Sequence, residues 1–257
     1  MDDRVEVLIA ALECNPEQLV SKMNIQTDAI LANQCSENSI FDFSYRGCLI
    51  KTLNFCERGV GLNRNNALMR ATGDFCLIAD DDMVYVDNYK DIVVHSFREN
   101  PDADVIVYNL IEKKPSRYFI KRKHHVHFYN FLRYGTARIA FRLSSVRKAN
   151  IFFHMQYGGG TEHSHGEDNI FLSDCLKHGL KIVALPVVIA ELNDDRPSTW
   201  NTGFTDKYFY DQGSLYRSVS RHFWFLLCFQ DVLRHSNTYK RPLFQVLNLM
   251  IKGGLSV

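Results

Sequence analysis

Three consecutive aspartates, Asp80, Asp81 and Asp82, directly follow an apolar run that begins at Phe75. The run predicts a strand buried on both faces, so the carboxylates must lie at its carboxyl end, outside the core. Like charges side by side raise one another's pKa, and a cluster that stays ionised needs a cation. Hard oxygen ligands suit Mg²⁺ or Mn²⁺, which also bind substrate phosphates. The sequence therefore predicts a divalent cation site, and a solvated acidic turn is the alternative.

A second acidic pair, Glu167 and Asp168, follows the segment GGGTEHSHG that begins at Gly158. Consecutive glycines let the backbone approach another group closely. The pair opens a predicted helix over 169–178, where the helix dipole favours acids, but the dipole does not explain the glycines. His163 and His165 lie beside the pair and are candidates for completing a metal shell or contacting a second substrate. Hydrogen-bonded loop histidines are the alternative.

Alternating strands and helices must position these two acidic groups. Apolar runs predict strands over 5–11, 29–32, 49–55, 75–79, 105–109 and 181–185, the last closed by Pro186. Capping signals and helical spacing predict helices over 16–23, 62–72, 87–100 and 169–178. This alternation predicts an α/β fold with a mostly parallel sheet and ligands at the carboxyl ends of the strands.

The composition excludes several classes of protein. The 257 residues carry a net charge of +1, which gives no reason to expect a nucleic-acid partner. The seven cysteines are scattered and form no CxxC pair, which favours a reducing cytosol. No apolar run is long enough for a signal peptide or a membrane span, so we expect a soluble or peripheral protein. A nicotinamide-binding protein is excluded because Gly59 and Gly61 lack a third glycine at the required spacing.

Two stretches are unusually basic. Residues 112–127 include six lysines and arginines and three histidines, so this stretch is either a solvated loop or a phosphate contact. Residues 211–257 carry six Lys or Arg against two Asp, interleaved with aromatic and aliphatic side chains. This tail suits a membrane interface, a helical unit packed on the core, or a dimer contact. We therefore divide the chain into residues 1–203, the catalytic domain, and 204–257, a C-terminal helical extension.

The ordered motifs resemble a known family. The strand with DDD, the preceding GVGLNRNNAL and the following GGGTEHSHGEDN are similar to inverting GT-A fold glycosyltransferases of family 2, over about residues 5–192. The closest resemblance is to bacterial enzymes that assemble capsular or extracellular polysaccharide. It implies a Rossmann-like GT-A sheet and a metal-dependent enzyme that moves a sugar from a nucleotide diphosphate sugar, expected to be a UDP-sugar. The acceptor would be a hydroxyl of a saccharide or polyprenyl-linked saccharide at the inner face of the cell membrane.

The resemblance also implies roles for individual residues. The general base would be Asp168, paired with Glu167, and the cation would be held by Asp82 and Asp80. The nucleotide sugar would contact Ala10, Ala11, Gln34, Arg64, Asn65, Asp80 and Asp81. The acceptor would contact Gly159, Gly160 and Trp200, although a lone tryptophan in a loop is as often a packing anchor.

The chain departs from the family pattern at two points. Gln34, in Asn33-Gln34-Cys35-Ser36, stands where relatives often carry an acid that reads the base, and its amide can both donate and accept. The QxxRW motif of processive members is absent, which favours one sugar per visit. A metal-dependent phosphohydrolase and a non-catalytic scaffold with the same fold are the alternative functions.

Overall fold

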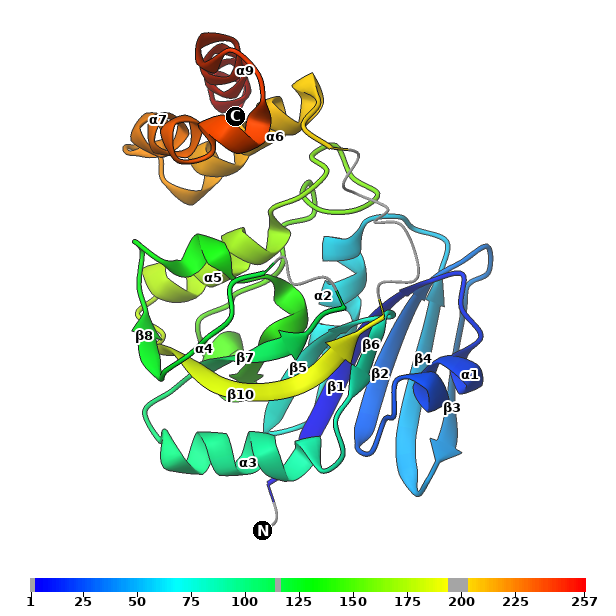
Figure 1. Ribbon diagram of the computed structural model, residues 1–257. Coiled ribbons are helices and arrows are strands. Elements are labelled where there is room, and N and C mark those ends of the chain that lie inside the picture. The colour runs from blue at the N-terminus through cyan, green and yellow to red at the C-terminus, as the bar shows by residue number, and fades with distance from the viewer. Residues whose placement is uncertain (1–2, 114–116, 194–202) are drawn as a thin grey trace.

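A mixed sheet forms the centre of the computed structural model, which describes residues 3–113, 117–193 and 203–257 (Figure 1). Its strands in the described residues are β1 (Val5–Leu12), β2 (Asp28–Gln34), β3 (Ser39–Tyr45), β4 (Cys48–Phe55), β5 (Phe75–Asp80), β6 (Met83–Tyr85), β7 (Val105–Ile111), β8 (His124–Val126), β9 (Ile139–Arg142) and β10 (Ile182–Leu192). They follow the order β3-β4-β2-β1-β5-β9-β7-β10-β6, and β8 pairs with β10. Most of the long strands pair in parallel, β4 with β2, β2 with β1, β1 with β5, and β7 with β10, which confirms the predicted mostly parallel sheet. β3 pairs antiparallel with β4 at one edge of the sheet.

The antiparallel strands β3, β6, β8 and β9 were not predicted from sequence. β9 inserts between β5 and β7 and reverses direction, and β6 pairs antiparallel with the end of β10. The predicted end of the last strand at Pro186 is wrong, because β10 continues to Leu192 through a register shift between Ala184 and Val188. A bulge is one of the few places in a sheet that tolerates proline, which cannot donate to the ladder.

Helices cover both faces of the sheet. The α-helices of the described residues are α1 (Pro16–Lys22), α2 (Val60–Arg70), α3 (Tyr89–Glu99), α4 (Leu143–Lys148), α5 (Glu167–Lys177), α6 (Asp206–Val219), α7 (Trp224–Arg234), α8 (Ser236–Tyr239) and α9 (Leu243–Leu255). Two short 3₁₀ helices, η1 (Phe131–Arg133) and η2 (Thr136–Arg138), precede β9. Buried side chains of α1 and α3 form one core with the sheet, and those of α2, α4 and α5 form another. As predicted, Asn15 caps α1, accepting a hydrogen bond from the Gln18 amide at 3.0 Å.

The C-terminal helices gather beyond the carboxyl ends of the parallel strands, above α5 in Figure 1. Leu215 and Val219 of α6 belong to the same buried core as α5, so the helical extension packs on the rest of the chain. α6 and α9 cross closely: a Cβ at Gly213 would lie 1.8 Å from the Met250 carbonyl oxygen. No helix in the described ranges has the length and apolar character needed to cross a membrane. The proposed division at residues 203 and 204 stays a prediction.

Candidate active site

The aspartate triplet lies where the sequence predicts it, at the carboxyl end of a central strand. Asp80 is the last residue of β5 and pairs in register with Ala10 of β1. The Asp82 carbonyl accepts a hydrogen bond of 2.8 Å from the Asn193 amide, which ties the turn to the end of β10. Ala10 and Ala11 are buried, so β1 presents only backbone and methyl groups beside the triplet.

Asp82 has an unusual environment for a carboxylate. Burial, followed by the charges of Asp80 and Asp81, raises the pKa of Asp82 to about 6. Its Oδ1 is buried and has no hydrogen-bond partner in the part of the chain that the structure describes. A buried carboxylate oxygen without a donor is costly unless a bound group satisfies it. The side chain therefore fits a divalent cation.

Arg64 links the triplet to the second acidic pair. Its guanidinium donates to Asp80 Oδ1 at 2.6 Å and to Glu167 Oε1 at 2.7 Å, and its side chain is 3% exposed. Burial alone would lower the pKa of Arg64, but the charges of Asp80 and Glu167 outweigh it and raise the pKa above its ordinary value. The sequence reasoning assigned Arg64 to the nucleotide. The structure places it between the two carboxylates, 16 and 103 residues away along the chain, and its contact with the nucleotide stays a prediction.

The acidic pair forms the first turn of α5. Gly166 precedes it with φ +111°, a conformation that a side chain would strain. Asp168 Oδ1 accepts a hydrogen bond of 2.7 Å from the Asn169 amide. Burial, followed by the charge of Glu167, raises the pKa of Asp168 to about 7, while Arg64 acts in the opposite direction. A carboxylate with this pKa can accept a proton near neutral pH.

The glycine run lets the loop pass directly over Glu167. A Cβ at Gly158 would lie 2.7 Å from Glu167 Oε2 and 2.4 Å from Val60 Cγ1. The Gly159 carbonyl accepts a hydrogen bond of 3.0 Å from the Val60 amide, which fixes the loop on the first turn of α2. A Cβ at Gly159 would meet no heavy atom within 4 Å. Gly158 therefore packs directly against Glu167, the partner of Arg64, whereas Gly159 borders open space.

Two predicted nucleotide contacts have partners within the protein. Gln34 Oε1 accepts a hydrogen bond of 2.7 Å from the Gly59 amide, which fixes the turn before α2. The Asn65 amide makes two hydrogen bonds of 2.8 Å with the Phe153 backbone and is buried. Their roles in nucleotide binding stay predictions. The predicted acceptor contact Trp200 lies outside the described residues.

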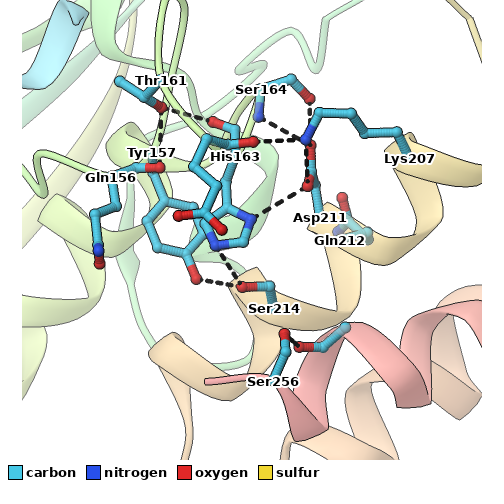
Figure 2. A network of polar contacts seen from close by, with 12 residues as sticks. Gln156, Tyr157, Thr161, His163, Ser164, Lys207, Asp211, Gln212, Ser214 and Ser256 are labelled. Atoms are coloured by element: carbon cyan, nitrogen blue, oxygen red, sulfur yellow. Dashed lines mark hydrogen bonds and ion pairs between the residues drawn. The ribbon is translucent and has the colours of Figure 1, made fainter.

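His163 lies in a polar network with α6 (Figure 2), and His165 also contacts this helix. His163 Nδ1 lies 3.2 Å from Asp211 Oδ1, and its Nε2 lies 3.2 Å from Ser214 Oγ. The ring of His165 is also held at both nitrogens, 3.1 Å from Ser164 Oγ and 2.8 Å from Gln212 Oε1. All four ring nitrogens thus lie near protein atoms, and the network fixes the glycine-rich loop on α6. A role of either histidine in a metal shell stays a prediction.

Asp211 is the centre of this network, and the sequence reasoning gave it no role. Its side chain is fully buried and accepts hydrogen bonds from the Ser164 amide at 2.9 Å and the Lys207 ammonium at 3.0 Å. Burial by itself raises its pKa, but the hydrogen bonds from Ser164, Lys207 and His163 lower the pKa below its ordinary value. No local sequence motif could indicate this role, because Asp211 lies 47 residues from Ser164 along the chain.

The donor set fits a cation that is shared with a substrate. The described residues contain no group of three or more His, Cys, Asp or Glu placed to hold a metal by themselves. Mg²⁺ and Mn²⁺ are commonly held by one or two carboxylates, with substrate phosphates and water completing the shell. Asp80 and Asp82 fit this arrangement, and Asp82 Oδ1 is an oxygen without a hydrogen-bond partner among the described residues.

Comparison with known proteins identifies the architecture. The family model described as "Glycosyl transferase family 2" matches residues 27–159, about half of the chain. S. aureus TarS 1-349, solved in complex with UDP-GlcNAc, is similar with a TM-score of 0.65 at 11% identity, covering 96% of this chain and 90% of that one. The mannosyltransferase PcManGT from Pyrobaculum calidifontis, solved with GDP-Man and Mn2+, has a TM-score of 0.55 at 12% identity and covers 97% and 73%. The search of curated proteins found no match.

Proposed function

The chain belongs to glycosyl transferase family 2, and we propose that it moves one sugar from a nucleotide diphosphate sugar to a hydroxyl of a saccharide acceptor, with inversion. The observation behind the proposal is the pair of hydrogen bonds, 2.6 and 2.7 Å, by which Arg64 joins Asp80 to Glu167. They join Asp80 of the proposed cation site to Glu167, the neighbour of the proposed base Asp168. This supports a single site, which a displacement between a bound donor and an incoming alcohol requires.

The aspartate triplet is the proposed donor site. Asp80 and Asp82 would hold Mn²⁺ or Mg²⁺, and the bound cation would neutralise the charge that develops on the departing diphosphate. The partnerless oxygen of Asp82 supports this assignment, and so does the Mn2+ bound to PcManGT. Asp81 adds a further negative charge that raises the pKa of Asp82.

Asp168 is the proposed general base. Its raised pKa of about 7 gives it enough basicity to take the acceptor proton while keeping a substantial ionised fraction at neutral pH. If the base and the diphosphate lie on opposite faces of the sugar, the acceptor oxygen attacks in line and inverts the anomeric centre. Glu167 would hold Arg64 and raise the basicity of Asp168 through its charge.

A UDP-sugar is the proposed donor. The support is the UDP-GlcNAc bound to the similar TarS structure, although PcManGT was solved with GDP-Man. The QxxRW motif of processive family members is absent, which supports transfer of a single sugar each time the acceptor binds. The acceptor is proposed to be a saccharide or a polyprenyl-linked saccharide of polysaccharide biosynthesis, such as a bacterial capsule.

The α7 helix is proposed to bind the inner, cytoplasmic face of the cell membrane. Its outer face exposes Phe225, Leu226, Phe229 and Leu233, each by about half. The acid of this helix, Asp231, has a side chain only 10% exposed and accepts a hydrogen bond from Tyr239. Arg221 and Arg234 are exposed near the two ends of the helix. Anionic lipid complements these charges, whereas a second copy of the helix would bring like charges together.

A donor screen tests the proposed activity. Thermal unfolding of the purified chain would be followed with UDP, GDP and their sugars, each with and without Mn²⁺. Because a ligand that binds only the folded state stabilises it, we expect a rise in Tm for one base that requires the cation. Release of nucleotide without transfer in the presence of saccharide acceptors would instead support a phosphohydrolase. Cation-dependent binding without any turnover would support a scaffold.

A further inference from the structure

The segment 117–138 differs sharply in charge from the rest of the chain. It contains six lysines or arginines and no acid, although the whole chain has a net charge of only +1. These residues are Arg117, Lys121, Arg122, Lys123, Arg133 and Arg138. We call this stretch the basic segment. Such an excess of one sign attracts ligands of the opposite charge.

The end of the basic segment lies beside the second acidic pair of the active site. There, Asn169 Nδ2 donates to the Tyr134 carbonyl at 3.2 Å, and a Cβ at Gly135 would lie 3.3 Å from Asp168 Oδ2. At the start of the segment, Arg117 is ion-paired with Glu112. The segment therefore borders the candidate base.

Arg133 and Tyr118 of the basic segment form an exposed surface, which we call the platform. The Arg133 guanidinium carbon lies 4.6 Å from the centroid of the Tyr118 ring, and Tyr118 is 40% exposed. The buried Arg138 fixes the platform from below by donating to the Tyr118 carbonyl at 2.9 Å and to the Tyr108 carbonyl at 2.6 Å. An adjoining cavity of about 200 Å³ is lined in part by Phe119 and by Arg117, which is paired there with Glu112. The platform is thus preorganised and combines aromatic faces with positive charge.

These features define the chemistry of a ligand. Tyrosine and phenylalanine faces can pack on the apolar side of a sugar ring, and an arginine fork matches the oxygens of a phosphate or carboxylate. The acids of the active site repel an anionic acceptor, and the basic segment offsets that repulsion. A neutral saccharide would gain nothing from the exposed positive charges of Lys121, Arg122, Lys123 and Arg133.

We propose that the basic segment is an acceptor-binding surface that selects saccharides carrying phosphate or carboxylate groups. The inference depends on the proposed glycosyltransferase function, because it places the anion beside the base that deprotonates the acceptor. Exposed Arg133, on the Tyr118 ring, is the residue that contacts the anion, and exposed Lys121, Arg122 and Lys123 attract it over a longer range.

Binding of dextran phosphate and of neutral dextran of equal length tests the proposal. Wild type should bind dextran phosphate, more weakly as salt rises, and neutral dextran much less. R133Q should weaken dextran phosphate binding by about tenfold, the loss of one charge-assisted hydrogen bond. The triple variant K121Q/R122Q/K123Q should reduce the salt dependence. R98Q is the matched control, because Arg98 is an exposed arginine of α3 paired with Asp3. Equal binding of the two dextrans, or equal affinity in R133Q and wild type, would overturn the proposal.

Farnesyl diphosphate and farnesol distinguish a lipid-borne anion from one in the saccharide. Tighter binding of farnesyl diphosphate than of dextran phosphate, lost in R133Q, would assign the anion to a lipid carrier. The reverse order would assign it to the saccharide. Either result supports the basic segment as the anion site.

UDP and GDP affinity with Mn²⁺, measured in the same variants, separates this proposal from the proposed function. R133Q should leave nucleotide affinity unchanged. Loss of nucleotide binding in R133Q, with its fold intact by circular dichroism, would assign the segment to the donor and overturn the acceptor role. A wild type that binds dextran phosphate but neither nucleotide would contradict the donor site while supporting an anion site on the basic segment.

Discussion

Asp168 sets the pH range in which transfer can occur. Only its ionised form can accept the acceptor proton, and its pKa is raised to about 7. We expect kcat/KM for transfer to fall as pH drops below about 7 and to level off above it, in initial-rate measurements between pH 5 and 9 with the cation saturating. A rate that stays constant from pH 5 to 8 would exclude a base with this pKa.

Arg64 lowers the proton affinity of Asp168 through its charge, so its replacement should move the pH profile. In R64M the midpoint should shift to higher pH. Leaving Asp80 and Glu167 without their shared partner should also lower the free energy of unfolding by about 3–5 kcal/mol. R64K is the matched variant, because it keeps the positive charge and should keep the midpoint nearer that of wild type. Its single ammonium cannot reproduce both hydrogen bonds of the guanidinium. An identical midpoint in R64M, measured where the variant is folded, would contradict this role.

At the scale of elements, Asp211 connects α6 to the glycine-rich loop. D211N removes the charge that accepts hydrogen bonds from Ser164, Lys207 and His163. We expect the free energy of unfolding in urea to fall by about 2–4 kcal/mol, because the site is fully buried and its hydrogen bonds are charge-assisted. D206N is the control, since Asp206 is 70% exposed, pairs with Arg241 and should cost less than about 1 kcal/mol. Equal losses in the two variants would show that the network does not fix α6.

The whole molecule should associate with anionic vesicles through α7. Sedimentation would compare phosphatidylcholine vesicles with and without phosphatidylglycerol, and only the anionic vesicles should retain the protein. F225S/F229S should weaken binding at least tenfold, because burying one phenylalanine contributes roughly 1.5–3 kcal/mol. I40S/F41S, which alters exposed apolar residues of β3, is the control.

Two outcomes would contradict the membrane role of α7. One is equal vesicle binding by F225S/F229S and wild type. The other is a concentration-dependent dimer that F225S/F229S abolishes while no vesicles are bound, which would assign the apolar face of the helix to a second copy.

The sequence predicted the parts of the molecule whose signals are local. β5 and its acidic end, and α5 with its acidic first turn, are confirmed because an apolar run or a cap marks each within a few residues. The joining of these parts could not be predicted: Arg64 reaches a residue 103 positions away, and nothing local shows where its guanidinium points. The same holds for the Asn65 amide, which the Phe153 backbone engages. β9 is a short strand of four residues without a periodic pattern of its own.

The paired variants D82N and D168N test most directly whether the two acidic groups form one site with two separate tasks. Titration calorimetry with the UDP-sugar and Mn²⁺, followed by assay of transfer and of the product anomer, would be applied to both. D82N should lose cation-dependent donor binding. D168N should bind the donor as wild type does and lose transfer by about 10²–10⁴-fold, the usual contribution of a general base. Full turnover in D168N, or normal cation-dependent binding in D82N, would contradict the account.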